Sequence, residues 1–181
     1  MNDLHARPTR IQELFPSAPY VIQADDACKF GMGRVFFTPG NDHNPLCLWR
    51  APFPDNIVND VVSWENPKGS ITNSDLELAG TVAGMDVAAH SYDLRERTQH
   101  VLTDNTPALA WQTKGSTTTT GPAAYLLRLC ALHQRFHRYV SLFDHIPGRD
   151  NQMADDCSRL WHLSDAQLLS HFDATYPQKH S

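Results

Sequence analysis

The chain has 181 residues, 41% of them hydrophobic, which is within the range of one domain with a single packed core. Its formal net charge is −5, so it lacks the strongly basic balance of a protein that holds nucleic acid through bulk electrostatics. No apolar run approaches the roughly 20 residues that a membrane span needs, and residues 1–10 lack the apolar stretch of a signal peptide.

The first third of the chain predicts an antiparallel meander of three strands. Residues 1–19 are polar and punctuated by proline, which is typical of a linker or the remnant of a preceding domain. Strand-like runs follow at 20–25 and 33–38, joined by a turn that contains glycine, and residues 46–53 suit a third strand.

The rest of the chain alternates helices with strands. Apolar positions at helical spacing predict a helix over residues 73–90, with Thr72, Asn73 or Ser74 as its N-cap. The order predicts an α/β protein with a five-stranded mixed sheet, a three-strand meander plus two crossover strands, flanked by helices. The later elements are a strand at 99–103, a short helix after Pro107, a helix over 122–138, a strand at 139–146, a helix over 149–161, and a last helix over 165–172 that Ser164 caps.

Four carboxylates stand at strand ends or in helices of this scheme. Asp26 ends the first strand, Glu77 lies in the first turn of the long helix, Asp104 ends the fourth strand, and Asp155 lies in a late helix. Buried carboxylates repel one another, so such a cluster is stable mainly when it holds divalent cations, and oxygen ligands favour Mg²⁺ or Mn²⁺ over zinc. Two such ions about 4 Å apart stabilise the attacking water and the leaving oxygen of a phosphodiester. The residues therefore predict phosphodiester hydrolysis.

Four sequence motifs resemble the ribonuclease H domain in reverse transcriptases of long-terminal-repeat retrotransposons. The segment DAC with the following GMG (26–33) is similar to the start of that domain, TNSDLEL (72–78) to the helix with its catalytic Glu, and TDN (103–105) to its third acidic motif. The most diagnostic segment is HIPGRDNQMADDCSRL (145–160), which resembles the ending H-x-P-G-x-x-N-x-x-A-D-x-x-S-R. The resemblance spans about residues 20–161, with the acidic motifs in the family's order.

The resemblance implies an endonuclease that hydrolyses the RNA strand of RNA–DNA hybrids during reverse transcription. The family's four metal-binding carboxylates hold two Mg²⁺ ions, with Mn²⁺ as a substitute. The residues that match them here are Asp26, Glu77, Asp104 and Asp155. The paired aspartates of the polymerase are absent from this sequence. The implied partners are therefore the hybrid and a polymerase domain in the parent polyprotein.

Three further residues are carried over from the family. His145 matches its mobile histidine near the scissile phosphate, where it assists proton transfer or product release. Asn105 and Ser74 are expected to position substrate or to support the carboxylates through hydrogen bonds. The chain departs from the family at Cys28, where serine is usual, and in lacking a lysine-rich substrate handle.

The best local candidate for gripping a nucleic-acid backbone is the basic stretch that ends the 122–138 helix. It supplies Arg135 and Arg138, and Lys114 is a possible addition. His133 and His137 lie four residues apart in the same stretch and suggest a metal pair, but the neighbouring arginines favour a solvated or phosphate-facing role.

Structural readings compete with two of the carboxylate assignments. Glu77 lies three residues after Ser74, so the pair could be an ordinary capping box. Asp25 competes with Asp26, because successive strand residues face opposite sides of a sheet. The match to the Asp-Ala motif favours Asp26.

The other two aspartates have competitors as well. Asp156 competes with Asp155, which the N-x-x-A-D spacing from Asn151 selects. Asp104 alone could be a helix cap.

Two other functions share this kind of fold. An inactive scaffold or connection domain usually lacks one or more carboxylates, and all four are present here. An integrase or transposase would need its last acidic residue as a Glu on the final helix, and the position of Glu77 before Asp104 argues against it. We expect a linker over 1–19, a nuclease domain over 20–161 and a C-terminal helix and tail over 162–181. The four sparse cysteines without a C-x-x-C pair favour an intracellular site, cytoplasmic, nuclear or within a virus-like particle.

Overall fold

The computed structural model describes residues 14–41, 44–119 and 121–177. Most of the expected linker, residues 1–13, therefore lies outside the described part. The elements are β1 (Pro19–Cys28), β2 (Gly31–Phe37), β3 (Cys47–Pro52), α3 (Asp55–Val58), α4 (Asn73–Ser91), β4 (Thr98–Thr103), α5 (Thr106–Lys114), α6 (Pro122–His137), β5 (Val140–His145), the 3-10 turn η1 (Gly148–Asp150), α7 (Gln152–Arg159) and α8 (Asp165–Thr175).

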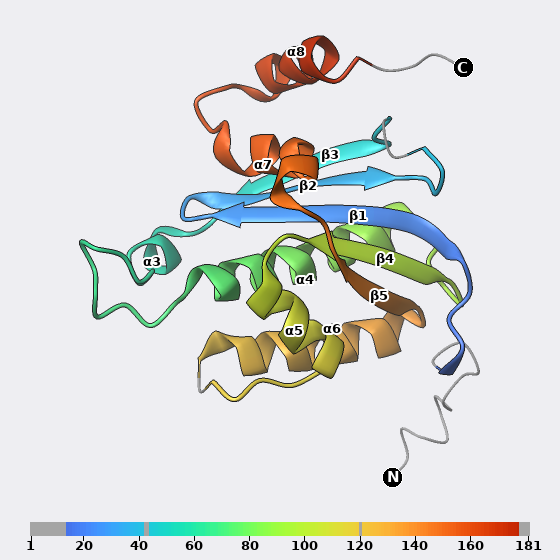
Figure 1. Ribbon diagram of the computed structural model, residues 1–181, viewed down its shortest axis with the longest axis horizontal. Helices are drawn as coiled ribbons and strands as arrows, with labels where there is room; N and C mark the ends of the chain where they lie inside the picture. The colour runs from blue at the N-terminus through green and yellow to red at the C-terminus, as the bar shows by residue number, and fades with distance from the viewer. Residues whose placement is uncertain (1–13, 42–43, 120, 178–181) are drawn as a thin grey trace.

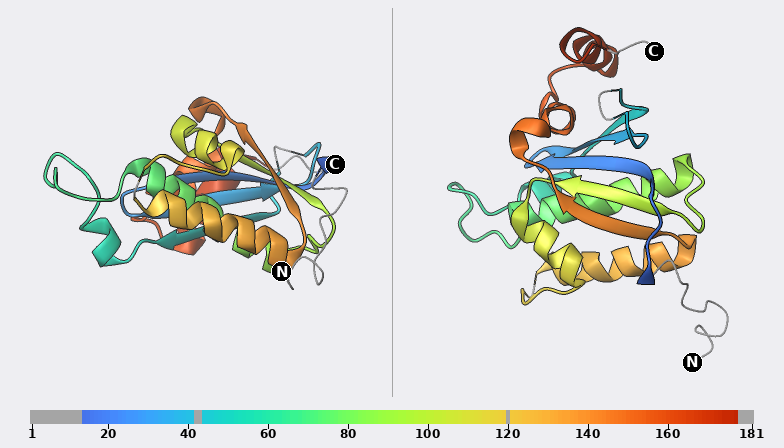
Figure 2. Two further views of the ribbon diagram at one scale, coloured as in Figure 1. Left: turned by 90° about the horizontal axis from the view of Figure 1, so that it is seen from below. Right: turned by 45° about the vertical axis from the view of Figure 1, so that its right-hand side comes forward.

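The strands form one five-stranded sheet in the order β3-β2-β1-β4-β5 (Figure 1). The β1–β2 and β2–β3 pairs are antiparallel, whereas the β1–β4 and β4–β5 pairs are parallel. The predicted fold class, a meander plus two crossover strands, is confirmed. In Figure 1 and the right-hand view of Figure 2, α4, α5 and α6 cover one face of the sheet, and α7 and α8 lie on the other.

The strand alternation divides the core between these two faces. On the α4 side, Val21 and Phe36 pack with Met85 of α4 and Cys130 of α6. The opposite face has its own cluster, which α8 joins through Phe172. The C-terminal helix is therefore packed onto the sheet layer rather than left as an isolated tail. None of the helices in the described ranges is long and apolar enough to cross a bilayer.

Two features differ from the sequence-based scheme. The strand β1 runs to Cys28 instead of ending near residue 25, because its pairing with β2 continues to the Cys28–Gly31 pair at the hairpin turn. Asp26 is consequently inside the strand and not at its end. The short helix α3 and a parallel bridge between Val61 and Ile71 were not predicted, since this segment has no clear apolar period.

Candidate active site

Three carboxylates from separate elements meet where the parallel strands end. The pairing of β1 with β4 stops at Asp25 and Thr103, so Asp26 and Asp104 each lie one residue beyond it. Glu77 reaches the same place from α4. Each of the three carboxylates has an oxygen within 4.8 Å of one from the others. Asp26 and Glu77 are only 2% and 3% exposed, so the cluster is mostly closed to water.

The alternation along β1 separates Asp25 from Asp26. Asp25 faces α4, where it accepts two hydrogen bonds from Gln23 Nε2 at 2.8 and 2.6 Å and lies 3.9 Å from Nε of the buried Arg34. Asp26 faces α7 and accepts a hydrogen bond from Ser158. Asp25 thus belongs to a buried polar network, and Asp26 is the residue that joins the carboxylate cluster.

Neither Glu77 nor Asp104 caps a helix, so both carboxylates are available as metal ligands. The N-cap of α4 is Thr72, and its capping box uses the side chain of Asp75, so Ser74 and Glu77 do not form one. Glu77 therefore lies in the second turn of α4, one turn later than expected. The N-cap of α5 is Asn105, whose Oδ1 accepts from Ala108 N at 2.9 Å.

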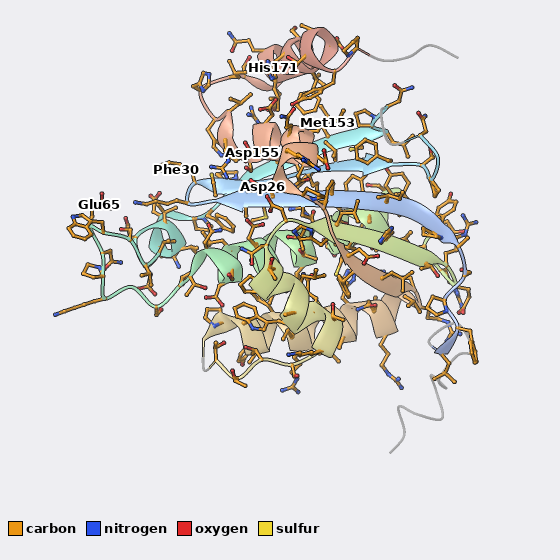
Figure 3. The ribbon with its side chains drawn as sticks, viewed as in Figure 1. Asp26, Phe30, Glu65, Met153, Asp155 and His171 are labelled. Carbon is orange, nitrogen blue, oxygen red and sulfur yellow. The ribbon has the colours of Figure 1, made fainter. Side chains whose placement is uncertain are left out.

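The fourth carboxylate, Asp155, approaches from α7, and Figure 3 shows it above Asp26. Its carboxylate accepts a hydrogen bond from Arg159, whose Nε also lies 3.9 Å from Asp26 Oδ2. Asp156 turns the other way and accepts from His171 at 2.7 Å and from Tyr176 at 2.9 Å. The geometry therefore places Asp155, and not its neighbour, toward the cluster.

Burial and mutual repulsion raise the pKa values of the clustered acids. Burial is the main cause that raises the pKa of Asp26 to about 6, and the charges of Asp155 and Asp104 add to it; the Ser158 hydrogen bond and Arg159 oppose the rise. Burial, followed by the charges of Asp26 and Asp104, raises the pKa of Glu77 to about 10. Without a cation, the protein thus keeps Glu77 protonated at neutral pH.

The donor set fits a hard divalent cation. Glu77 Oε2 is buried and has no hydrogen-bond partner among the described residues, although its other oxygen is 3.5 Å from Asn73 Nδ2. A buried oxygen without a partner is costly, and a cation would satisfy it. Carboxylate oxygens are the ligands that Mg²⁺ and Mn²⁺ prefer.

Three solved structures share this architecture. LC11-RNase H1 in complex with an RNA/DNA hybrid has a TM-score of 0.54 and 19% identity, covering 76% of this chain and 92% of that one. The N-terminal RNase H domain of rv2228c from Mycobacterium tuberculosis has a TM-score of 0.55 and 16% identity, covering 76% and 95%. The chain has the ribonuclease H fold. The foamy virus protease-reverse transcriptase in complex with an RNA/DNA hybrid has a TM-score of 0.50 and 11% identity, covering 79% of this chain and 20% of that one. No protein-family model and none of the curated proteins matches the chain.

The ribonuclease H fold also carries His145 to the carboxylate edge. His145 is the exposed last residue of β5 and pairs with Thr103, the residue before Asp104. At the start of η1, which follows β5, a Cβ on Gly148 would lie 3.1 Å from Asp104 Oδ2. The His-x-Pro-Gly segment therefore runs directly beside the cluster.

The basic residues proposed for substrate binding lie elsewhere in the ribonuclease H fold. Arg138 is the C-cap of α6, pairs with Glu96, and lies two residues before the first residue of β5. Arg135 is in the same last helical turn. Because β5 has six residues, this turn and His145 are separated by roughly 16 Å of strand. The structure does not bring these arginines to the carboxylates.

Two other predicted substrate residues are also set apart from the carboxylates. Lys114 is exposed at the last residue of α5, about 12 Å along that helix from its start beside Asp104. Ser74 lines a separate cavity of about 670 Å³, together with Trp111 and Gly121.

A cavity of about 420 Å³ beside Asp26 contains residues that the sequence analysis did not select. Its polar lining includes Lys29, Asn73 and Arg159. Arg159 could have been found from its position one turn after Asp155 on the same helix, which puts both side chains on one face. Lys29 had no such signal, because only the β1–β2 turn places it there.

Proposed function

We propose that this chain is a metal-dependent endonuclease that hydrolyses the RNA strand of RNA–DNA hybrids. The observation that carries the proposal is the meeting of Asp26, Glu77 and Asp104 within 4.8 Å, with a buried oxygen of Glu77 left without a hydrogen-bond partner. Together with Asp155 they would hold two Mg²⁺ ions, for which Mn²⁺ could substitute. Ions held there would activate the attacking water and stabilise charge on the leaving oxygen.

The side chains around the cluster have distinct tasks in this proposal. His145 is exposed at the edge of the cluster, where an imidazole can pass a proton to or from the reacting phosphate and assist product release. Arg159 offsets the charge of Asp26 and Asp155 and lines the adjoining cavity with Lys29. These two cations are suited to contact backbone phosphates next to the scissile bond. Asn105, as the cap of α5, keeps Asp104 at the strand end.

The net charge of −5 makes a broad electrostatic grip on nucleic acid unfavourable, so the hybrid would be held by local contacts. We therefore propose that residues 20–161 act as the nuclease unit of a reverse transcriptase of long-terminal-repeat retrotransposon type, with a polymerase domain supplying further contacts to the hybrid. Binding of hybrid by LC11-RNase H1 and by the foamy virus protease-reverse transcriptase supports this substrate class.

The direct test is cleavage of an end-labelled RNA–DNA hybrid by the purified chain with Mg²⁺ or Mn²⁺. Duplex DNA and duplex RNA serve as competing substrates, and EDTA as the metal-free control. We expect cleavage of the RNA strand of the hybrid alone, lost in EDTA and in Asp104→Asn.

Two matched variants on α7 make the test more specific. Asp155→Asn should reduce cleavage at least 100-fold, because one of the proposed Mg²⁺ ligands is removed, whereas Asp156→Asn should keep activity within about threefold. Equal loss in both variants would show that α7 has only a structural role. A folded, metal-binding chain that cleaves no substrate would support the alternative of an inactive scaffold domain.

A further inference from the structure

A second group of metal-ligating side chains lies at the seam between α4 and α6. Asp86 and His90 are four residues apart on α4, and His133 and His137 are four residues apart on α6. Side chains with this spacing share one face of a helix, and α4 packs against α6. Glu77 and His90 are separated by about 20 Å along α4, so this group is independent of the carboxylate cluster.

Three of the four side chains are already close to ligand geometry. Ligand atoms of Asp86, His133 and His137 all lie within 4.8 Å of one another. His133 Nε2 is 3.2 Å from Asp86 Oδ1, which matches the separation of about 3.3 Å between neighbouring ligand atoms in a tetrahedral zinc site. The rings of His133 and His137 are 4.3 Å apart between centroids.

His90 can supply the fourth ligand. Its Nδ1 is in a hydrogen bond with the Asp86 backbone oxygen at 2.8 Å and lies 3.5 Å from Asp86 Oδ1, so the ligand atom would be Nε2; its ring centroid is 5.6 Å from that of His137. The His90 side chain is 67% exposed, so it can rotate toward a shared ion without disturbing the core.

A buried tyrosine orients the central histidine. The Tyr139 hydroxyl lies 2.8 Å from His133 Nδ1 and is carried by a residue that is only 1% exposed. A hydrogen bond from the second ring N–H of a metal-bound histidine fixes its tautomer and ring plane, and the Tyr139 hydroxyl oxygen can accept such a bond. The contact directs His133 Nε2 toward Asp86.

The local electrostatics also suit a cation. His90 and His137 each lie in the last turn of their helix, where the helix dipole favours positive charge.

We propose that Asp86, His90, His133 and His137 bind one Zn²⁺ ion that clamps the C-terminal ends of α4 and α6 together. An imidazole-rich set with one carboxylate selects zinc-like ions over the Mg²⁺ suited to the carboxylate cluster. The clamp would stabilise α4, the helix that positions Glu77, without taking part in hydrolysis.

The test is zinc titration of the full chain by calorimetry, with excess Mg²⁺ to occupy the carboxylate cluster. We expect one Zn²⁺ per chain and a rise in Tm of roughly 5 to 10 °C when free Zn²⁺ is 100 times the Kd. Co²⁺ in place of Zn²⁺ should give the intense visible absorption of four-coordinate cobalt, which carboxylate-bound Co²⁺ lacks.

Variants decide whether the binding belongs to this seam. His137→Ala should weaken Zn²⁺ binding at least tenfold, and His90→Ala, at an exposed position, serves if His137→Ala does not fold. The exposed His162, between α7 and α8, is the matched control, and His162→Ala should bind as wild type. Absence of Zn²⁺ binding, or binding that survives loss of both His90 and His137, would overturn the proposal.

Discussion

Replacing Glu77 with glutamine should stabilise the metal-free protein at neutral pH. The buried carboxyl has its pKa raised from 4.5 to about 10, so the folded chain holds a proton that the unfolded chain has released. The free energy of unfolding therefore falls as the pH rises above 4.5, by about 1.4 kcal/mol per pH unit, and the loss is on the order of 3 kcal/mol at pH 7. Glutamine has nearly the same shape and no proton to gain, so Glu77→Gln should recover this amount.

The assay is urea unfolding together with thermal melting of wild type and Glu77→Gln in EDTA from pH 4 to pH 8. At pH 4 the two proteins should have equal stability, and at pH 7 the variant should melt about 6 to 12 °C higher. Glu65→Gln, at an exposed position labelled in Figure 3, is the matched control and should keep the wild-type fall in stability between pH 5 and pH 8. Mg²⁺ should raise the Tm of wild type but not of Glu77→Gln. A variant with the wild-type pH slope would refute the assignment of the raised pKa to Glu77.

The remaining predictions concern the elements that surround the cluster. Gly33→Ala should cost about 1 to 3 kcal/mol in urea unfolding and also reduce cleavage, because its Cβ would lie 2.3 Å from the backbone nitrogen of Ser158 in α7. Gly80→Ala, whose Cβ would meet nothing closer than 3.5 Å, is the control and should be neutral or stabilising. Mg²⁺ affinity, measured by calorimetry, should rise with pH as Asp26 ionises, with a midpoint at about pH 6. Ser158→Ala removes a hydrogen bond to the Asp26 carboxylate and should move this midpoint upward. An unchanged midpoint would contradict the proposed hydrogen bond. His145→Ala should lower turnover about 100-fold with little change in the Tm, and wild-type turnover would exclude a role in proton transfer.

Local sequence patterns were sufficient for most of the fold. The Pro at the start of α6 and the glycine at the turn between β1 and β2 act through local backbone conformation, and the capping serine of α8 acts through a hydrogen bond to a nearby residue, so their effects can be predicted without the tertiary structure. Element ends were less certain. The strand β1 extends to Cys28 because β2 continues to pair with it, which is a long-range effect that the residues of β1 do not encode alone.

The candidate site shows the same division. Motif order selected the four acids. Strand alternation allowed only one of Asp25 and Asp26 to face the cluster, and the sequence favoured Asp26 without deciding between them. The ion pair of Asp25 with Arg34, and the use of Asp75 rather than Glu77 in the cap, exist only in the folded chain.

The sequence by itself determined the element types, the meander followed by crossover strands, and the oxygen-rich chemistry of the acids, because these follow from side-chain period and residue type. Only the tertiary structure decided which acids meet, that Arg159 and Lys29 lie beside them, and that Arg135 and Arg138 do not. It also joined the histidine pair of α6 to Asp86 and His90 of α4. These outcomes depend on the packing of elements far apart in the chain, and distance along a sequence carries no information about which helix faces will touch.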